Sequence, residues 1–377
     1  MKQYLSLSTP TMHGEELKFI EEAFEKNWIA PLGFNCDGFE KEMGEYLSEG
    51  KDSPKYSCLS LNSGTSALHL AVKLAGVKKD DIVLCSDMTF AATVNPVSYE
   101  GGIQVYVDSE RETWNMDPVA LERAFQKYPA AKVVMLVHLY GTPAKMDEII
   151  EVCKRHNAII IEDAAEALSA KYKGKHCGTF GKYNVVSFNG NKIITTSGGG
   201  MLITEDRVAR DKAFFWSTQS RESYPWYEHK EIGYNYRMSN VVAGIGRGQL
   251  MHLEEHREKK TEIYNRYKEG FSDLPIEMNP FLEQTVPNFW LSCILLNKGC
   301  EVKPLQILER LKEENIESRP LWKPMHMQPV FKDNDFITAN DEAVDEDLFE
   351  RGLCLPSDIK MTEKEQQIVI DIVKSMF

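Results

Sequence analysis

The sequence has eight cysteines in 377 residues but no C-x-x-C pair. Zinc sites commonly use such pairs, so the cysteine pattern predicts no zinc site, and we predict no other metal site. Cys58, Cys85, Cys153 and Cys293 lie in apolar stretches. We therefore expect buried free thiols in a reducing cytoplasm, and not a disulfide framework.

Long hydrophobic runs, an excess of positive charge and internal repeats are missing too. No apolar run approaches the roughly 18 residues that cross a bilayer, and the first residues lack the basic and apolar regions of a signal peptide. The 44 basic residues are outnumbered by 57 acidic ones, giving a formal net charge of −13. This balance argues against nucleic acid or an anionic membrane as a partner. A soluble, cytoplasmic protein is predicted.

Strand-like and helix-like patterns alternate through about residue 205. Asp117-Pro118 opens one of the helical segments as N-cap and first-turn proline. The alternation predicts an α/β fold, with a mostly parallel sheet and helices on both faces. Strands are expected at residues 82–85, 103–107, 133–137 and 158–161, and helices at residues 117–126 and 146–156.

The chain is longer than the usual span of one hydrophobic core, so two domains are predicted. We expect a large domain over residues 1–250 and a smaller C-terminal α/β domain over residues 251–377. A charged helix from Leu250 to Lys268 would connect them. The small domain would contain a strand at residues 289–296, a helix at residues 304–314 and a proline-containing loop at residues 319–324.

A lysine follows one predicted strand, in the run Val185-Val186-Ser187-Phe188-Asn189-Gly190-Asn191-Lys192. The β-branched residues lead into an Asn-Gly turn, which places Lys192 just past the strand end. A lysine so placed can enter a cleft and form a Schiff base with pyridoxal 5'-phosphate (PLP). Taken alone, the pattern is more often that of a solvated surface lysine.

A carboxylate ends another predicted strand. The apolar run at residues 158–161 precedes Glu162 and Asp163, as expected for a parallel strand covered on both faces. Open α/β sheets place ligand contacts at the carboxyl ends of such strands. Asp163 could hold the pyridine nitrogen of PLP in its protonated form. The alternative is an aspartate that caps the next helix.

A third motif, Asn62-Ser63-Gly64-Thr65-Ser66, joins a short strand to a segment with apolar residues at helical spacing. Backbone N–H groups and hydroxyls at a helix N-terminus favour an anion. The motif is not a nucleotide P-loop, and it suits a single phosphate monoester. An ordinary N-cap is the alternative.

In this order, the three motifs resemble the PLP-dependent sugar aminotransferases of the DegT/DnrJ/EryC1/StrS family, which have the type I aspartate aminotransferase fold. The resemblance extends from Trp28 to Ser357 and rests on Ser187-Phe188-x-x-x-Lys192 with Glu162-Asp163-Ala164-Ala165. It implies PLP as the cofactor, a Schiff base on Lys192 and a homodimer with shared active sites.

The resemblance also implies roles for other residues. Asp163 would pair with the ring nitrogen, Phe90 would stack on the ring, and Glu166 would lie beside the phenolic oxygen. The phosphate would be held by Gly64, Thr65, Ser66 and Ser187, and by Asn235 of a neighbouring subunit. The implied substrate contacts are Arg237, Arg319, Lys323 and His326.

The implied reaction moves an amino group from L-glutamate to C4 of a UDP-2-acetamido-2,6-dideoxy-4-keto-hexose, as in bacillosamine-type glycan biosynthesis. The alternative substrate is GDP-4-keto-6-deoxymannose, which gives GDP-perosamine. A non-catalytic regulator with the same fold is the third possibility, although it would not need Lys192, Asp163 and Ser187 together.

Two further patterns are interpreted without a catalytic role. The glycines between Gly244 and Gly248 do not follow a strand, so we interpret them as close helix packing and not as a dinucleotide site. His138 follows a buried strand, where a site residue and a hydrogen-bonded core histidine are equally consistent with the pattern.

Overall fold

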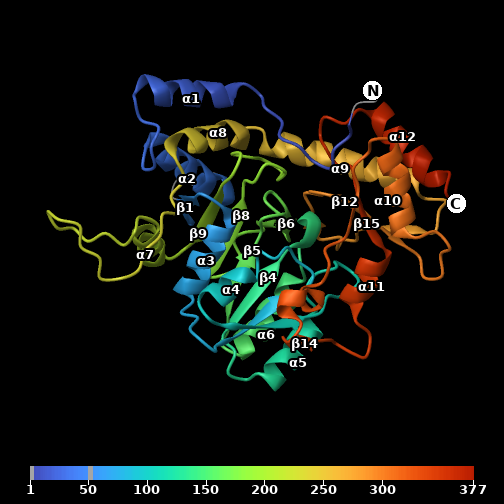
Figure 1. Ribbon diagram of the computed structural model, residues 1–377, viewed down its shortest axis with the longest axis horizontal. Helices are drawn as coiled ribbons and strands as arrows, with labels where there is room; N and C mark the ends of the chain where they lie inside the picture. Colours follow the sequence, from blue (N-terminus) through green and yellow to red (C-terminus); the bar gives the residue numbers. More distant parts are fainter. Residues whose placement is uncertain (1–3, 50–53) are drawn as a thin grey trace.

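A computed structural model describes residues 4–49 and 54–377, and its centre is an eight-stranded sheet (Figure 1). The pairings from β8 through β5, β4, β2 and β3 to β14 are all parallel, whereas β9 is antiparallel to both of its neighbours. The mostly parallel sheet is thus confirmed. In spatial order the strands are β1 (Ser57–Leu61), β9 (Gly200–Thr204), β8 (Tyr183–Ser187), β5 (Ile159–Asp163), β4 (Val133–Val137), β2 (Ile82–Ser86), β3 (Ile103–Val107) and β14 (Phe336–Ile337).

Helices cover both faces of this sheet, which confirms the predicted fold class. On one face, apolar residues of α3 and α7 form a core with β1, β2, β5 and β8. On the other face, α5 and α6 pack against β2, β3 and β4. The helices of this part are α1 (Glu15–Glu25), α2 (Phe34–Leu47), α3 (Gly64–Leu74), α4 (Asn95–Tyr99), α5 (Pro118–Lys127), α6 (Met146–Arg155), α7 (Arg207–Ser217) and α8 (Asn240–Leu250).

Local sequence signals place several of these elements as predicted. Asp117 caps α5, since its carboxylate accepts hydrogen bonds from the N–H groups of Val119 and Ala120. The glycines of α8 allow the predicted close packing. A Cβ at Gly246 would lie 2.6 Å from the ring of Phe39, and one at Gly248 would lie 2.6 Å from the backbone nitrogen of Glu16.

A second, four-stranded sheet lies within the C-terminal part of the chain, with its own core. Its strands are β10 (Ile276–Met278), β12 (Ser292–Leu296), β15 (Gly352–Leu355) and β13 (Arg319–Pro320). Its helices are α9 (Leu253–Gly270), α10 (Pro304–Glu313), α11 (Val344–Arg351) and α12 (Glu363–Lys374). A small three-stranded sheet is made of β11 (Thr285–Val286), β6 (Lys171–Tyr172) and β7 (Lys175–His176).

Two details differ from the predicted small domain. The strand expected from Phe289 begins only at Ser292, because Phe289 has a φ of 47°, which is incompatible with an extended strand. The segment at Arg319, expected to be a loop, contributes β13 to the second sheet.

Segments cross between the two sheets. β14 comes from the C-terminal part but pairs with β3 of the large sheet, and Leu5 bridges Ile316 beside the second sheet. The division into two domains after residue 250 stays a prediction.

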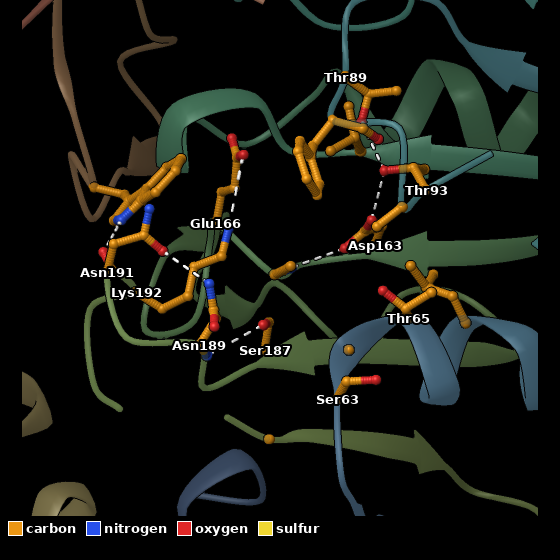
Figure 2. Close-up of a pocket in the computed structure, with 18 of the residues that line it drawn as sticks. Ser63, Thr65, Thr89, Thr93, Asp163, Glu166, Ser187, Asn189, Asn191 and Lys192 are labelled. Atoms are coloured by element: carbon orange, nitrogen blue, oxygen red, sulfur yellow. Dashed lines mark hydrogen bonds and ion pairs between the residues drawn. The ribbon is translucent and has the colours of Figure 1, made fainter. Parts of the chain in front are cut away.

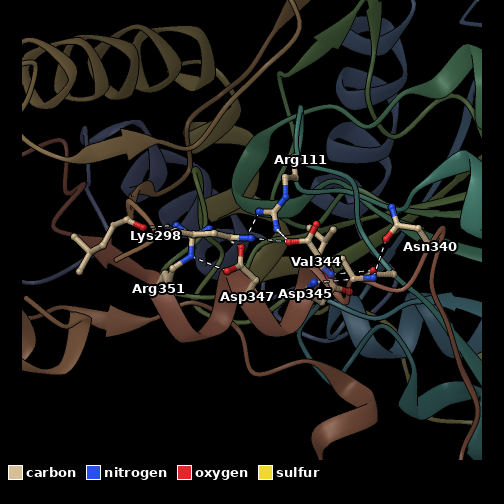
Figure 3. A network of polar contacts seen from close by, with 10 residues as sticks. Arg111, Lys298, Asn340, Val344, Asp345, Asp347 and Arg351 are labelled. Atoms are coloured by element: carbon tan, nitrogen blue, oxygen red, sulfur yellow. Dashed lines mark hydrogen bonds and ion pairs between the residues drawn. The ribbon is translucent and has the colours of Figure 1, made fainter. Parts of the chain in front are cut away.

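A polar network ties α11 to the segment that follows β3 (Figure 3). Arg111 donates to Asp347 at 2.7 Å and to Glu342 at 2.6 Å. Lys298 donates to Glu342 at 2.7 Å, and Arg351 donates to Asp347 at 2.7 Å. Each acidic residue thus bridges two basic ones. The network holds a helix of the C-terminal part against the large sheet.

The expected burial of four thiols is confirmed. All eight cysteines are free, and Cys58, Cys85, Cys153 and Cys293 are buried. Within residues 4–49 and 54–377, no helix has both the length and the apolar character needed to cross a membrane.

Candidate active site

A cavity of about 310 Å³ opens at the carboxyl ends of the parallel strands. Asp163 ends β5 and Ser187 ends β8, so both reach the same edge of the sheet. The N-terminus of α3 and the segment after β2 also line the cavity, as do Trp290 and Trp322 from the C-terminal part. The volume is in the range of small-molecule sites.

Lys192 lies in the connection between the antiparallel strands β8 and β9. A turn closes here, in which the Lys192 N–H donates to the Asn189 carbonyl at 3.0 Å. The ammonium is 3.8 Å from a carboxylate oxygen of Glu166 and 4.1 Å from the centre of the Trp290 ring. The side chain is 12% exposed, so the lysine lines the cavity and is not a solvated surface residue.

Asp163 faces the cavity from the other side (Figure 2). One carboxylate oxygen accepts from the Thr93 hydroxyl at 2.7 Å, and the other accepts from the Ala165 N–H at 3.0 Å. Thr89 in turn contacts the Thr93 hydroxyl at 2.6 Å. Burial raises the pKa of Asp163, while the Thr93 hydrogen bond opposes the rise. A positive charge within the cavity would stabilise this carboxylate.

Glu166 is a second buried carboxyl group in the cavity. It accepts from the Tyr140 N–H at 2.7 Å and from the Trp322 indole at 3.3 Å. The backbone N–H of Trp322 donates to the Tyr140 hydroxyl at 2.7 Å, so Trp322 is held at both its side chain and its backbone. Burial raises the pKa of Glu166, and the charge of Lys192 opposes this rise.

The N-terminus of α3 closes the remaining side of the cavity with Ser63, Gly64 and Thr65, next to Ser187 (Figure 2). Ser63 is the N-cap and accepts from the Ser66 N–H at 3.0 Å. A Cβ at Gly64 would lie only 3.0 Å from the Cβ of Ser187, so glycine allows the helix to approach β8 closely. The first N–H groups of a helix have no partners within it, and they favour an anion.

These residues fit PLP by their chemistry. The cavity offers an amine, a buried carboxylate with a raised pKa and a hydroxyl-rich helix N-terminus, each on a different wall. PLP has the complementary groups, which are an aldehyde, a basic ring nitrogen and a phosphate.

The structure brings Gly64, Thr65, Phe90, Asp163, Glu166, Ser187 and Lys192 together, as predicted. The phenyl group of Phe90 is 53% exposed, and its centre is 5.3 Å from that of Trp322. Asn235 is exposed and does not line the cavity of its own subunit. A role for Asn235 at a neighbouring subunit stays a prediction.

Two predicted contacts point elsewhere, and we correct them. The Ser66 hydroxyl donates to Asn62 at 2.7 Å, behind the turn, and Ser66 does not line the cavity. The Arg237 guanidinium is buried against Glu40 and the Ser60 carbonyl, at 2.8 Å from each. Arg237 is therefore a structural residue that joins α2 to β1, and it is not free to bind substrate.

The three basic residues of the segment at 319–326 are also separated from the cavity. Arg319 and Lys323 line another hollow, and Arg319 pairs with Glu317 at 2.8 Å. His326 donates to buried Asp87 at 2.6 Å and lies 3.2 Å from Glu346. Burial lowers the pKa of His326, but the hydrogen bonds and charges of Asp87 and Glu346 together raise it by more, so the pKa lies above its usual value. The structure thus does not assemble the predicted basic clamp in this subunit.

Sequence reasoning missed Thr93, Trp290 and Trp322 as cavity residues. Thr93 lies three residues after Phe90, so its proximity to a predicted site residue was a usable signal. Trp290 and Trp322 come from the C-terminal part, and no local pattern relates them to Lys192.

His138 is the hydrogen-bonded core histidine of the two alternatives. It is fully buried, Nε2 is 2.8 Å from Glu162, and Nδ1 accepts from the Ala144 N–H at 3.0 Å. Both ring nitrogens therefore have partners, and the residue does not reach the cavity.

The fold and this site define a type I PLP-dependent enzyme, and comparison with known proteins gives the family. Residues 10–374 match the model of the DegT/DnrJ/EryC1/StrS aminotransferase family. The chain belongs to this family, and it is a PLP-dependent nucleotide-sugar aminotransferase.

Individual relatives agree. EpsN of Bacillus subtilis, which carries the name of a pyridoxal phosphate-dependent aminotransferase, is 47% identical over 100% of this chain and 97% of its own. A GDP-perosamine synthase of Escherichia coli O157:H7 is 32% identical over 100% of this chain and 99% of its own. The crystal structure of a family member from Brucella abortus has a TM-score of 0.86 and 25% identity, covering 96% of this chain and 95% of its own.

Because the pKa of Glu166 is raised, we expect this residue to affect how the stability of the PLP-free protein depends on pH. A carboxyl group whose folded pKa exceeds its unfolded value stabilises the fold below the unfolded pKa, about 4.3, and loses this contribution as pH rises through the folded pKa. Glu166→Gln removes this titration. We expect its free energy of unfolding in urea to rise relative to wild type between pH 4.5 and pH 8.

Exposed Glu283 provides the matched control. The difference in free energy of unfolding between Glu283→Gln and wild type should be the same at pH 4.5 and at pH 8. A Glu166→Gln protein whose difference from wild type is the same at both pH values would contradict the burial argument.

Proposed function

We propose that the enzyme transfers an amino group from L-glutamate to C4 of a UDP-2-acetamido-2,6-dideoxy-4-keto-hexose. The observation that carries the amino transfer is that Lys192 and Asp163 face one cavity from opposite walls. The choice of sugar rests on the sequence around the lysine, residues 189–200, which resembles that of family members acting on UDP-4-keto-sugars. The products would be 2-oxoglutarate and a UDP-4-amino-sugar.

The chain's own residues divide the work. PLP, when bound, supplies an electron sink for the carbon that loses a proton. Asp163 would keep the ring nitrogen protonated, and its hydrogen bonds from Thr93 and Ala165 orient the carboxylate for this. Ser63, Thr65 and Ser187 would bind the phosphate at the N-terminus of α3, with the N–H groups of its first turn.

Lys192 would have two tasks. Its amine would hold the cofactor covalently at rest, and the incoming amino donor would release it. The freed Nζ would then move a proton from the α-carbon of the donor to the cofactor and, in the second half-reaction, from the cofactor to C4 of the sugar. Glu166, 3.8 Å from Nζ, would stabilise the amine while it holds the proton.

GDP-4-keto-6-deoxymannose is the second candidate substrate. The observation in its favour is that three GDP-perosamine synthases are 30–34% identical to this chain over nearly its whole length. Both substrates present the same 4-keto group and pyrophosphate, so the residues at Lys192 serve either one.

Steady-state kinetics with the two keto-sugars separates the candidates. We expect a higher kcat/KM for the UDP sugar, with the product read by mass spectrometry. A preference of tenfold or more for the GDP sugar, about 1.4 kcal/mol of transition-state discrimination, would reverse the assignment.

We further propose that the active unit is a homodimer in which Asn235 reaches the phosphate site of the partner subunit. Asn235 is exposed in one subunit and is held by a bridge to Thr218, and its carbonyl accepts from Asn62 at 3.2 Å. Asn62 adjoins the phosphate turn. The position of Asn235 thus suits an interface residue close to such a site.

Subunit complementation tests the shared site. Lys192→Ala and Asn235→Ala proteins should each be impaired, and their heterodimer should contain one intact composite site. Random exchange of equal amounts should restore about a quarter of the wild-type activity, since half of the dimers are mixed and each has one good site. Exchange proved by mass spectrometry without any recovery would count against a shared site.

A further inference from the structure

The backbone at Lys192 is held on both sides by ring N–H groups. The Trp290 indole donates to the Asn191 carbonyl at 2.7 Å. His256 donates from Nδ1 to the Ile193 carbonyl, also at 2.7 Å. Carbonyl oxygens only accept, so each ring nitrogen must carry its proton. The peptide group that precedes Lys192 and the one that follows Ile193 are thereby fixed.

Helix α9 supplies one of these contacts and supports the other. His256 makes one directly. Lys260, one turn further along, is 2% exposed and donates to the carbonyls of Trp290 at 2.9 Å and Ser357 at 2.8 Å. Burial lowers the pKa of Lys260 to about 8. Helix α9 therefore supports the connection that contains Lys192 through both His256 and Lys260.

The second nitrogen of His256 leads to the segment before α1. His256 is 2% exposed, and its Nε2 lies 2.7 Å from Nε2 of His13. Since Nδ1 is the donor to Ile193, neutral His256 has a lone pair on Nε2, and His13 donates to it. A chain of hydrogen bonds thus runs from half-buried His13 to the residue after Lys192.

His13 also stacks on His252, with ring centres 3.7 Å apart and planes within 7°. His252 contacts Glu15 and Glu255, each at 3.2 Å. His13, His252 and Glu255 place potential ligand atoms within 4.8 Å of one another. Stacked rings have nitrogen lone pairs in nearly parallel planes, which do not converge on one ion, so hydrogen bonding accounts for this cluster better than metal binding.

We propose that His256 is a positioning residue for Lys192, held in the Nδ1–H tautomer by the Ile193 carbonyl and kept neutral by its contact with His13. It touches neither substrate nor cofactor and acts through the backbone. The inference rests on the proposed role of Lys192. Small displacements of a reacting group are costly, because about 1 Å can reduce a rate on the order of a hundredfold.

The proposal predicts how kcat depends on pH on the acid side. The groups that face His256 are His13 from the segment before α1, and Lys260 and Glu255 from its own helix. Burial lowers the pKa of His256, and the charges of His13 and Lys260 lower it further, whereas the Ile193 contact and Glu255 raise it. A lowered pKa means that the neutral form of His256, which accepts from His13 at Nε2, stabilises the fold above the unfolded pKa, about 6.5, and that this contribution is lost as pH falls through the folded value.

Three variants test the proposal in the PLP-loaded enzyme. His256→Leu removes both hydrogen bonds. His256→Asn keeps an amide N–H near the position of Nδ1. His13→Ala leaves the Ile193 contact and removes only the neighbour of Nε2. The measurements are kcat and KM against pH, and hydrogen–deuterium exchange of the peptide over residues 189–197.

We expect His256→Leu to lower kcat on the order of tenfold to a hundredfold with little change in KM, and to accelerate exchange in that peptide. His256→Asn should recover most of the loss at pH 8. His13→Ala should move the acid limb of kcat to higher pH, because His256 becomes easier to protonate.

Equal losses in the leucine and asparagine variants, or an unchanged acid limb in His13→Ala, would overturn the proposal. The His13→Ala arm stands even if His256→Leu fails to fold. Borohydride labelling of the wild type is done first. Labelling at a lysine other than Lys192 would refute the proposed function itself. If Lys192 is labelled, the His256 and His13 variants then decide whether His256 positions it.

Discussion

Lys192→Ala should abolish transamination, with a fall in kcat of at least about 10⁴-fold, because one amine serves as covalent anchor and as proton shuttle. The variant should still bind PLP, since the proposed phosphate site at α3 and the carboxylate of Asp163 remain. Equilibrium dialysis measures the bound PLP, and mass spectrometry of the product measures turnover. Bound PLP should leave completely on denaturation without reduction.

Lys182 provides the matched control. It is exposed and directly precedes β8, the strand that leads to Lys192, ten residues before that lysine. Lys182→Ala should keep wild-type kcat and KM. A Lys192→Ala enzyme with more than about 1% of wild-type kcat would mean that another base serves the reaction.

Asp163→Asn should be the second most damaging change, with kcat about 10²- to 10⁴-fold lower. Asparagine keeps the shape and can still accept from Thr93, but it removes the negative charge that would hold the ring nitrogen protonated. The affinity for PLP should fall much less than kcat. Single-turnover rates with L-glutamate separate the chemical step from binding.

Thr93→Val is a milder change at the same carboxylate. It removes the hydroxyl that donates to Asp163 at 2.7 Å and leaves the charge in place. Loss of one such hydrogen bond should lower kcat by about tenfold or less. Equal effects of Thr93→Val and Asp163→Asn would show that packing matters here and the charge does not.

The residues that the sequence placed correctly are those with a contiguous signal. Asp163 and Lys192 each follow an apolar run that ends in a polar residue, and parallel strands bring such ends to one edge. Gly64 and Thr65 lie at a strand-to-helix junction, which is also local. Thus the central sheet and three walls of the cavity were predictable.

The remaining features depend on contacts between distant segments. Trp290 and Trp322 enter the cavity through the packing of the C-terminal part, with no periodicity to reveal them. The family resemblance implied that Arg237 and His326, two basic residues, contact the substrate. A charge does not reveal its partner, and here the partners are the buried carboxylates of Glu40 and Asp87. His256 had no motif at all.

Reduction of the PLP-loaded enzyme with borohydride, followed by proteolysis and peptide mass mapping, tests the central claim most directly. It fixes PLP to the amine that holds it. We expect the label in the peptide that contains Lys192 and loss of that label when L-glutamate is added before reduction. A label on any other lysine, or none at all in enzyme that has bound PLP, would contradict the account.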